Sequence, residues 1–366
     1  MIPVAAPTRL SVNERDGIIA GVTSVVDSDR WIGGAMVERF ERDFADYTIS
    51  EHVVGVGNGT DALCIALLAL DLPPGSGLLV PANDGGYAAT AARMVGLEPI
   101  AMDIDEFTLV PTASTASRAE SAHRGSLSAI VVTHLHGNVT PLAAIDEWRK
   151  AAGLALIEDC SQAHGAPGVG TFGDAAAYSF YPTKNLGAIG DAGAVTFSSL
   201  GLAERARAIR EYGWEKERFR SMLSGGRNSR LDPVQAAVLL ARLPFLDERN
   251  ERRRAIRDSY AKALSGGEDR VAGELLAGVA HHAVVVSARR DELANFLAKN
   301  EIDSQIHYPY LVQEMPGLAA IGDTPVAATV REQILSIPCF PEMSDGEVGR
   351  VESALSAWQD GSARDF

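Results

Sequence analysis

The sequence predicts an α/β protein. A large domain with a mixed, mostly parallel seven-stranded sheet between helices is expected to precede a smaller α+β domain. Strand-like and helix-like segments alternate through roughly the first 200 residues, a pattern typical of such a sheet. From about residue 265 the pattern changes to shorter strands and helices. We therefore expect a large domain at residues 1–244, which includes an N-terminal helical arm. A linking helix and the small domain are expected at residues 245–366.

Seven segments of the large domain have the apolar character of strands. They are residues 52–56, 78–81, 98–104, 129–133, 154–157, 175–180 and 193–197. A first helix is expected after Ser11, because Glu14 three residues later completes a capping box. Further helices are expected at residues 37–47, 61–72, 143–152, 202–212 and 233–243, and one begins near Tyr87. Residues 112–124 are weakly patterned and are expected to form a connection.

The small domain follows a linking helix that is expected at residues 245–264. Its expected strands are residues 283–287, 304–308 and 334–337, and its expected helices are residues 291–300 and 345–358. Glu248 and Glu251 precede four arginines in the linking helix, which predicts a solvent-exposed face with ion pairs. These arginines are Arg252, Arg253, Arg254 and Arg257.

The composition of the 366 residues is that of an ordinary globular protein, with 46% hydrophobic residues and a net charge of −15. The negative charge argues against a nucleic-acid partner, because a phosphate backbone needs a basic surface. Neither a membrane-spanning apolar run nor a secretory pattern is recognised, so we expect a cytoplasmic protein without a membrane partner. Cys64, Cys160 and Cys339 are widely spaced, which predicts reduced thiols and neither disulfides nor a zinc site.

Lys184 has surroundings that are unusual for a surface lysine. It follows the strand-like residues 175–180, and glycines at 187, 190 and 193 leave room for a bound molecule. A lysine amine can attack a carbonyl, and pyridoxal phosphate is the carbonyl that proteins most often hold in this way. The pyridine nitrogen of that cofactor needs a carboxylate, which Asp159 can supply from the end of another predicted strand. Each residue alone also fits a plainer role, as a loop lysine and a surface acid.

A tight turn at residues 57–60 links a predicted strand to an apolar helix. Backbone N–H groups at such a helix start, with glycine allowing close approach, suit a phosphate group. Gly57, Gly59 and Ala62 also match the fingerprint of dinucleotide-binding proteins, with Asp84 beyond the next strand. A nicotinamide-dependent sugar-nucleotide oxidoreductase is therefore an alternative. Against it, Phe180 stands where a short-chain dehydrogenase needs a tyrosine, and Lys184 and Asp159 would be unexplained.

His134 and His136 are separated by one residue, a His-x-His spacing that can indicate a metal site, here with Asp159 and His164 as further ligands. The remaining spacings do not match those of known metal sites, so we expect no metal.

The motifs around Lys184 resemble those of the DegT/StrS family of nucleotide-sugar aminotransferases, over nearly the whole chain. Glu158 to Ala166 and Ser179 to Gly193 carry the resemblance. It implies a fold type I transferase with pyridoxal phosphate, or its pyridoxamine form, bound covalently to Lys184. It also implies transfer of an amino group from an amino acid, glutamate in the family. The acceptor would be a keto-deoxy sugar nucleotide, such as a dTDP-linked 3- or 4-keto-6-deoxyhexose, in amino-sugar biosynthesis.

The resemblance also assigns roles to residues. Catalysis falls to Lys184 and Asp159, and cofactor binding to Gly59, Thr60, Asp61, Tyr87, Asp159, Gln162, Ser179, Lys184 and Asn228. Asn228 is expected to reach the neighbouring subunit's cofactor, which implies a homodimer with composite sites. The substrate contacts implied are His136, Tyr181, Arg230, His307 and Tyr308. A locally basic pocket for the anionic sugar nucleotide would come from Arg218, Arg220, Arg227 and Arg230.

The sequence departs from the family pattern at three places, and two further functions remain as alternatives. Gly85 and Gly86 are unusual before Tyr87, His136 stands where the family commonly has tyrosine, and residues 310–312 replace the usual Pro-Leu-His. Some relatives dehydrate sugars, but those characteristically carry histidine in place of Lys184. A non-enzymatic cofactor-binding regulator is a further alternative, without a basic DNA-binding segment to support it. The sequence leaves open which sugar carbon and which nucleotide are used.

Overall fold

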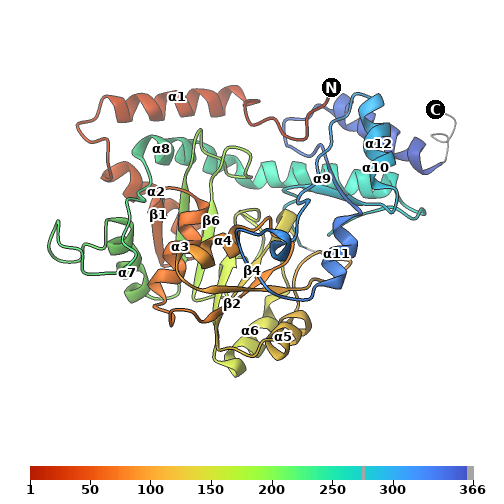
Figure 1. Cartoon of the computed structure of the whole chain (residues 1–366). Coiled ribbons are helices and arrows are strands. Elements are labelled where there is room, and N and C mark those ends of the chain that lie inside the picture. The colour runs from red at the N-terminus through yellow and green to blue at the C-terminus, as the bar shows by residue number, and fades with distance from the viewer. Residues whose placement is uncertain (274–276, 361–366) are drawn as a thin grey trace.

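The computed structural model describes residues 1–273 and 277–360 (Figure 1). Seven strands form the large sheet: β1 (His52–Val56), β2 (Gly77–Pro81), β3 (Glu98–Met102), β4 (Leu127–Thr133), β5 (Ala155–Asp159), β6 (Ala175–Ser179) and β7 (Gly193–Phe197). Their spatial order is β1-β7-β6-β5-β4-β2-β3. β7 runs antiparallel to both of its neighbours, and the remaining pairs are parallel. The predicted mixed, mostly parallel sheet is confirmed.

Helices cover both faces of this sheet (Figure 1). They are α2 (Ala35–Thr48), α3 (Gly59–Ala69), α4 (Tyr87–Met94), α5 (Ala113–Ala122), α6 (Leu142–Ala152), α7 (Leu200–Arg210) and α8 (Pro233–Arg242). Successive residues of a strand point to opposite faces, so Val131 packs with α3 and α4 whereas Ile130 packs with α5 and α6. α3 is apolar on nearly all sides because it is buried between the sheet and α4 and α7.

The N-terminal arm is α1 (Val12–Val26), and it packs along α8 (Figure 1). The predicted capping box is present: the Glu14 N–H donates to the Ser11 hydroxyl over 3.2 Å, and the Glu14 carboxylate accepts from the Ser11 backbone. Gly21 allows the close approach of the two helices, since an added Cβ would lie 3.3 Å from the Cβ of Ala237.

The C-terminal part begins with the predicted long helix, α9 (Leu246–Ala263). A three-stranded antiparallel sheet of order β10-β9-β8 follows. Its elements and the helices around it are β8 (Arg270–Val271), β9 (Ala283–Val286), α10 (Arg290–Lys299), α11 (Pro325–Arg331), β10 (Ile334–Ile337) and α12 (Asp345–Gln359). The separation of the two domains at residue 245 stays a prediction. No helix among the described residues combines the length and apolar character needed to cross a membrane.

Three expectations were wrong. Residues 304–308 are not a strand: Gln305 makes a single bridge to Ser336, after which the chain turns toward the large sheet. Residues 112–124 contain the helix α5, whose apolar stripe consists of small alanines at 113, 116 and 119 and which is opened by a capping box between Thr112 and Thr115. Arg253 and Arg257 are buried rather than solvated. Arg253 donates to two backbone carbonyls, those of His281 and Cys339, which explains why it faces inward.

Candidate active site

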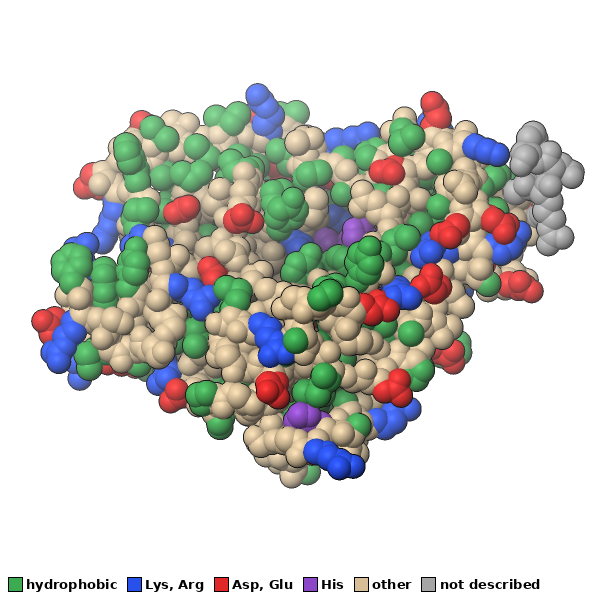
Figure 2. Space-filling model, in the orientation of Figure 1, with side chains coloured by type: hydrophobic (Ala, Val, Ile, Leu, Met, Phe, Trp, Pro, Cys, Tyr) green, Lys and Arg blue, Asp and Glu red, His purple; other side chains and the backbone are tan. Residues whose placement is uncertain are grey.

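The polar residues that follow β1, β2, β4, β5 and β6 converge at one edge of the sheet, because these strands run in the same direction. A cavity of about 460 Å³ opens there. The space-filling view shows a hollow in this face with histidine side chains at its bottom (Figure 2). The lining residues include Gly59, Thr60, Asp84, Tyr87, Asp159, Gln162, Ser179, Tyr181, Lys184, His281, His282, His307 and Tyr308. Most of the residues expected at the site therefore meet in one cavity.

Lys184 is placed by a tight connection after β6. Its N–H donates to the carbonyl of Tyr181 over 2.8 Å, and the Ala188 N–H donates to Phe180 over 2.8 Å. The amine is partly buried in the cavity wall, and burial lowers the pKa of Lys184 to about 8 although the charge of Asp159 opposes the shift. Its amine is therefore neutral much more often near pH 8 than that of an ordinary lysine, as nucleophilic and proton-transfer chemistry requires.

Asp159 ends β5 and is buried in the same cavity. Its carboxylate accepts the N–H of Ser161 over 3.0 Å. A second buried carboxyl, Asp84, also lines the cavity and accepts the N–H groups of Gly86 and Ala88. Burial raises the pKa of Asp84 to about 7, and the nearby charge of Asp159 adds to that effect. Sequence reasoning placed Asp84 only in the nicotinamide alternative and missed this position.

The turn before α3 is built to leave N–H groups free. Asn58 caps the helix by accepting the Asp61 N–H over 2.8 Å, while the N–H groups of the first helical residues, Gly59 and Thr60, have no partner within a helix. Gly59 lies so close to β6 that an added Cβ would be 2.5 Å from the Cβ of Ser179. The hydroxyls of Thr60 and Ser179 line the cavity beside these N–H groups, an arrangement that suits an anion.

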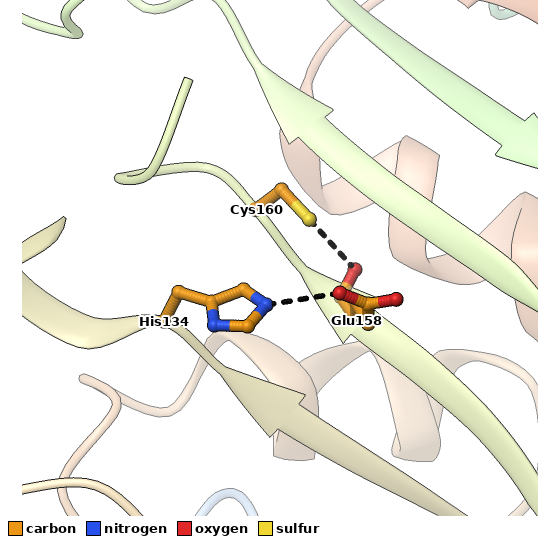
Figure 3. A group of neighbouring side chains, drawn as sticks. All are labelled: His134, Glu158 and Cys160. Atoms are coloured by element: carbon orange, nitrogen blue, oxygen red, sulfur yellow. Dashed lines mark hydrogen bonds and ion pairs between the residues drawn. The ribbon is translucent and has the colours of Figure 1, made fainter. Parts of the chain in front are cut away.

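We call Gly59, Thr60, Asp159, Ser179 and Lys184 the strand-end wall of the cavity. Glu158 supports this wall from behind, where it is buried beside His134 and Cys160 (Figure 3). One Glu158 oxygen accepts the N–H groups of Phe172 and Gly173, and the other accepts the N–H of Gly170 and lies 3.1 Å from His134 Nε2. Burial tends to raise the pKa of Glu158, but these donors outweigh it and leave the pKa below its ordinary value.

The same three side chains have ligand atoms within 4.8 Å of one another, which raises the question of a metal. His134 Nδ1 accepts the N–H of Thr140 over 3.1 Å, so the proton of a neutral ring lies on Nε2 and is donated to Glu158. The Cys160 thiol faces the Glu158 backbone carbonyl at 3.8 Å (Figure 3). Burial and the charges of Glu158 and Asp159 raise the pKa of Cys160 well above its ordinary value. Hydrogen bonds thus occupy the atoms that a metal would need.

Aromatic and amide side chains line another part of the cavity. Tyr87 starts α4 after the two glycines, both with positive φ, and its ring lies 5.9 Å from that of Tyr308. Gln162 donates to the Tyr308 hydroxyl over 3.1 Å and accepts the N–H of His136 over 2.6 Å. Gln162 therefore links the segment after β4 to the segment between α10 and α11 that carries Tyr308.

Three histidines, His281, His282 and His307, form what we call the histidine wall. The rings of His282 and His307 are stacked, with centroids 4.2 Å apart and planes 3° apart. His136 lies behind this wall: it is 1% exposed, and its Nδ1 is 3.2 Å from Nδ1 of His282. Sequence reasoning missed His281 and His282, although two adjacent histidines directly before an apolar strand were a signal that could have been used.

Four of the expected residues do not line the cavity of their own chain. Asp61 pairs with Arg227 over 2.9 Å, beside the turn that is expected to bind a phosphate. Asn228 is exposed in the connection between α7 and α8, and Arg230 is partly buried nearby. His136 is enclosed behind His282, so it does not meet a molecule in the cavity directly. None of the four arginines expected to form a basic pocket lines this cavity: Arg218, for example, lies over the exposed ring of Phe219.

The fold and this site define a pyridoxal-phosphate-dependent aminotransferase. The crystal structure of Streptomyces venezuelae DesV superposes with a TM-score of 0.91 at 34% identity, covering 98% of both chains. The Bacillus subtilis structure titled ntda, with bound cofactor PMP, gives a TM-score of 0.90 at 27% identity, over 97% of this chain and 84% of that one. The sequence is also 36% identical to dTDP-3-amino-3,4,6-trideoxy-alpha-D-glucose transaminase of Streptomyces venezuelae, over 93% of this chain and 91% of the relative.

A family profile, that of the DegT/DnrJ/EryC1/StrS aminotransferases, matches residues 13–356. The chain belongs to this family, as the motifs around Lys184 predicted. The predicted fold and aminotransferase class are confirmed, and the nicotinamide alternative loses its support.

The residues of the cavity fit pyridoxal phosphate. The free N–H groups of Gly59 and Thr60, with the Ser179 hydroxyl, suit its phosphate, and a side chain at 59 would clash with Ser179. Asp159 offers a carboxylate for the pyridine nitrogen, and Lys184 offers an amine of lowered pKa.

Proposed function

We propose that this protein transfers the amino group of an amino acid, glutamate, to the keto group of a keto-deoxy sugar nucleotide. The observation that carries the proposal is the meeting of Lys184, Asp159 and the free N–H groups of Gly59 and Thr60 in one cavity. The acceptor we favour is a dTDP-linked 3- or 4-keto-6-deoxyhexose, because the relative from Streptomyces venezuelae is named for a dTDP-linked amino sugar. Glutamate rests on the family resemblance.

When bound, pyridoxal phosphate supplies an aldehyde that condenses with amines and an electron-poor ring that takes up the electrons of the neighbouring C–H bond. Lys184 is the residue we propose to hold it covalently. Whenever its amine is free, Lys184 Nζ would take the proton from the substrate carbon and return it at the neighbouring position, because it is a base tethered in the cavity. Asp159 keeps the ring nitrogen protonated, and Tyr87 packs on the ring.

The remaining cofactor contacts belong to the same proposal. Thr60, Ser179 and the turn at Gly59 hold the phosphate, and Asp61 keeps the turn in place through Arg227. Gln162 meets the ring hydroxyl, and Tyr181, His307 and Tyr308 meet the sugar from the cavity wall. The assignments of His136 and Arg230 as direct sugar contacts are weaker, since neither lines the cavity of its own chain.

We also propose that the protein is a homodimer and that Asn228 completes the partner's cofactor site. Asn228 is exposed outside the cavity of its own chain, as a residue that reaches a neighbour must be. Large apolar side chains stand exposed on the same connection and on the N-terminal arm's turn, including Phe219 at 75%, Met222 at 52% and Trp31 at 67%. The cytoplasmic location stays a prediction.

Purified protein supplied with pyridoxal phosphate tests the proposal. We expect a visible absorbance band that shifts when glutamate is added, and an amino sugar nucleotide as the product of a dTDP-3-keto or dTDP-4-keto deoxy sugar. Mass spectrometry and NMR of the product identify the aminated carbon. A band that shifts only with NAD, or no amino product from either sugar, would overturn it. Sedimentation analysis at several concentrations tests the dimer, and a monomer that is active at low concentration contradicts the composite site.

A further inference from the structure

His282 of the histidine wall shares a hydrogen bond with His136, which lies behind the wall. His136 and His282 face each other through their Nδ1 atoms at 3.2 Å, so one Nδ1 carries the proton and the other accepts it. The backbone holds the two rings together, since the His282 N–H also donates to the His136 carbonyl over 3.2 Å. This part of the molecule includes a residue, His136, at a position where the family commonly has tyrosine.

The burial of His136 indicates which of the two rings donates the hydrogen between the Nδ1 atoms. Its Nε2 is buried and has no hydrogen-bond partner among the described residues. If the proton were on that atom, a buried N–H would be left without an acceptor, which proteins tolerate less well than a buried acceptor without a donor. The proton of His136 therefore lies on Nδ1, and it is donated to Nδ1 of His282. A neutral His282 must then carry its own proton on Nε2.

The Nε2 edge of His282 faces open space. No hydrogen bond joins this atom to another residue in the described part of the chain, and the ring is partly exposed to two cavities that it helps to separate. One is the cavity of Lys184, and the other has a volume of about 370 Å³ and lies toward the N-terminal segment. Burial, together with the charges of His307 and His136, keeps the pKa of His282 well below its ordinary value, so the ring stays neutral.

We propose that His282 is a substrate-binding residue whose Nε2–H donates to an oxygen of the bound substrate, and that His136 is the positioning residue that fixes this hydrogen on Nε2. The ring of His307 stacks on His282 and limits its rotation. The Nδ1 atom of His307 is held at 3.0 Å from the Ser336 hydroxyl, which fixes the orientation of that ring in turn. The acceptor oxygen belongs either to the sugar or to a carboxylate of the amino donor. This inference rests on the proposed function for its substrates.

Substitution of His282 tests the contact. Glutamine can place an amide N–H close to the position of Nε2, whereas methionine fills a similar volume without a donor. We expect His282→Met to lower kcat/KM about tenfold to a hundredfold and His282→Gln to retain most of it. Measuring each half-reaction separately identifies the oxygen: a loss confined to the glutamate step assigns a donor carboxylate, and a loss confined to the sugar step assigns the sugar. Equal activity of the two variants would overturn the proposal.

The hydrogen position has its own test, which needs neither substrate nor cofactor. In protein labelled with ¹³C and ¹⁵N in histidine, the ring carbon shifts distinguish an Nε2–H from an Nδ1–H ring, and the signal missing in His282→Gln identifies His282. We expect the Nε2–H form in the wild type. A wild-type His282 in the Nδ1–H form would overturn the assignment, whatever the enzyme's substrates prove to be.

Two variants of His136 then connect the tautomer to function. Asparagine adopts the positive φ of 61° found here, and its amide nitrogen can replace Nδ1 as a donor, whereas alanine cannot donate. We expect His136→Asn to keep both the Nε2–H signal and the activity. His136→Ala should mix the tautomers and raise KM about tenfold in the half-reaction affected in His282→Met, with little change in kcat. If His136→Ala keeps a pure Nε2–H signal, His136 has no positioning role. A failure of every sugar substrate, with the tautomer as expected, would instead count against the proposed function.

Discussion

The strand-end wall and the histidine wall face the same cavity, but they are assembled differently. Each residue of the strand-end wall ends a strand or follows one within a few residues, and backbone N–H groups fix its surroundings. The histidine wall combines His281 and His282, which precede β9, with His307 from an irregular segment between α10 and α11. One backbone hydrogen bond joins His282 to His136, but the ring orientations are fixed by side-chain contacts, such as the His136–His282 contact and the His307–Ser336 bond.

This difference suggests a division of roles. A wall fixed by the backbone can hold the same cofactor while surface residues change, since its geometry depends on the sheet. A wall held by side chains changes its donors and acceptors with single substitutions, so it is the more suitable part for distinguishing substrates. One departure from the family pattern, His136, contacts that second wall.

The largest effect is expected from Lys184→Ala on the strand-end wall. It removes the amine that moves the proton, so the rate of transamination should fall about a thousandfold or more. The variant should also lose the absorbance change that follows addition of glutamate. A small added amine, such as methylamine, should restore part of the rate, because it can transfer the proton in place of Lys184. Lys299→Ala, an exposed helix position, is the control and should match the wild type. If transamination persists in Lys184→Ala, Lys184 does not move the proton, and the role given to the strand-end wall is wrong.

A second prediction tests the support behind that wall. In Glu158→Gln one carboxylate oxygen becomes an amide nitrogen, which must face either two backbone N–H groups or a backbone N–H and His134. We expect the free energy of unfolding to fall by about 3 kcal/mol, because buried N–H donors then face an amide N–H₂ and lose their acceptor. Urea unfolding monitored by circular dichroism measures it. Glu51→Gln changes an exposed carboxylate and should have little effect; a similarly small effect of Glu158→Gln would mean that the wall does not depend on this side chain.

The sequence predicted the strand-end wall well because its information is local. Lys184, Asp159 and the turn at Gly59 each stand at the end of an apolar strand pattern, and parallel strands bring such ends together. The capping box of α1 is a local signal of the same kind.

The histidine wall was harder to predict because its contacts depend on tertiary packing. Nothing near His136 in the sequence indicates that His282 lies 3.2 Å away, and the adjacent pair at 281 and 282 has no periodic pattern. Arg253 was misjudged for a related reason: helical spacing suggested a solvated face, whereas carbonyls of distant segments hold it inside. Residues 304–308 resemble a strand locally, yet the chain leaves the sheet there and brings His307 and Tyr308 to the cavity.

A third prediction concerns the pH dependence of stability in cofactor-free protein. The folded-state pKa of Lys184 is about 8, below the ordinary 10.5, so between these pH values the unfolded chain binds a proton that the folded chain does not. The wild type should therefore gain stability as pH rises from about 8 to about 10.5, relative to Lys184→Met, by up to about 3 kcal/mol. Below pH 8 the difference should level off. Parallel urea titrations of the two proteins measure it, and a difference that does not vary with pH would show that the amine is not desolvated.

The smallest effect is expected at the phosphate turn, where the strand-end wall depends on the absence of a side chain. In Gly59→Ala the new Cβ would lie 2.5 Å from the Cβ and 3.2 Å from the Cα of Ser179. The Cα belongs to β6 and is held by the ladder, so the turn must move and carry its two free N–H groups away from the phosphate. We expect affinity for pyridoxal phosphate to fall about tenfold, with a smaller loss of stability. Absorbance titration of the cofactor-free protein gives the affinity.

Gly201→Ala is the matched control for that substitution, because an added Cβ at this position of α7 meets no atom within 4 Å. The alanine there should leave cofactor affinity unchanged and raise stability slightly, since alanine favours the helix more than glycine does. If Gly59→Ala binds the cofactor as well as Gly201→Ala does, the turn can move without loss and the phosphate is not held by its N–H groups. The backbone would then fix less of the strand-end wall than its geometry suggests, and the contrast with the histidine wall would narrow.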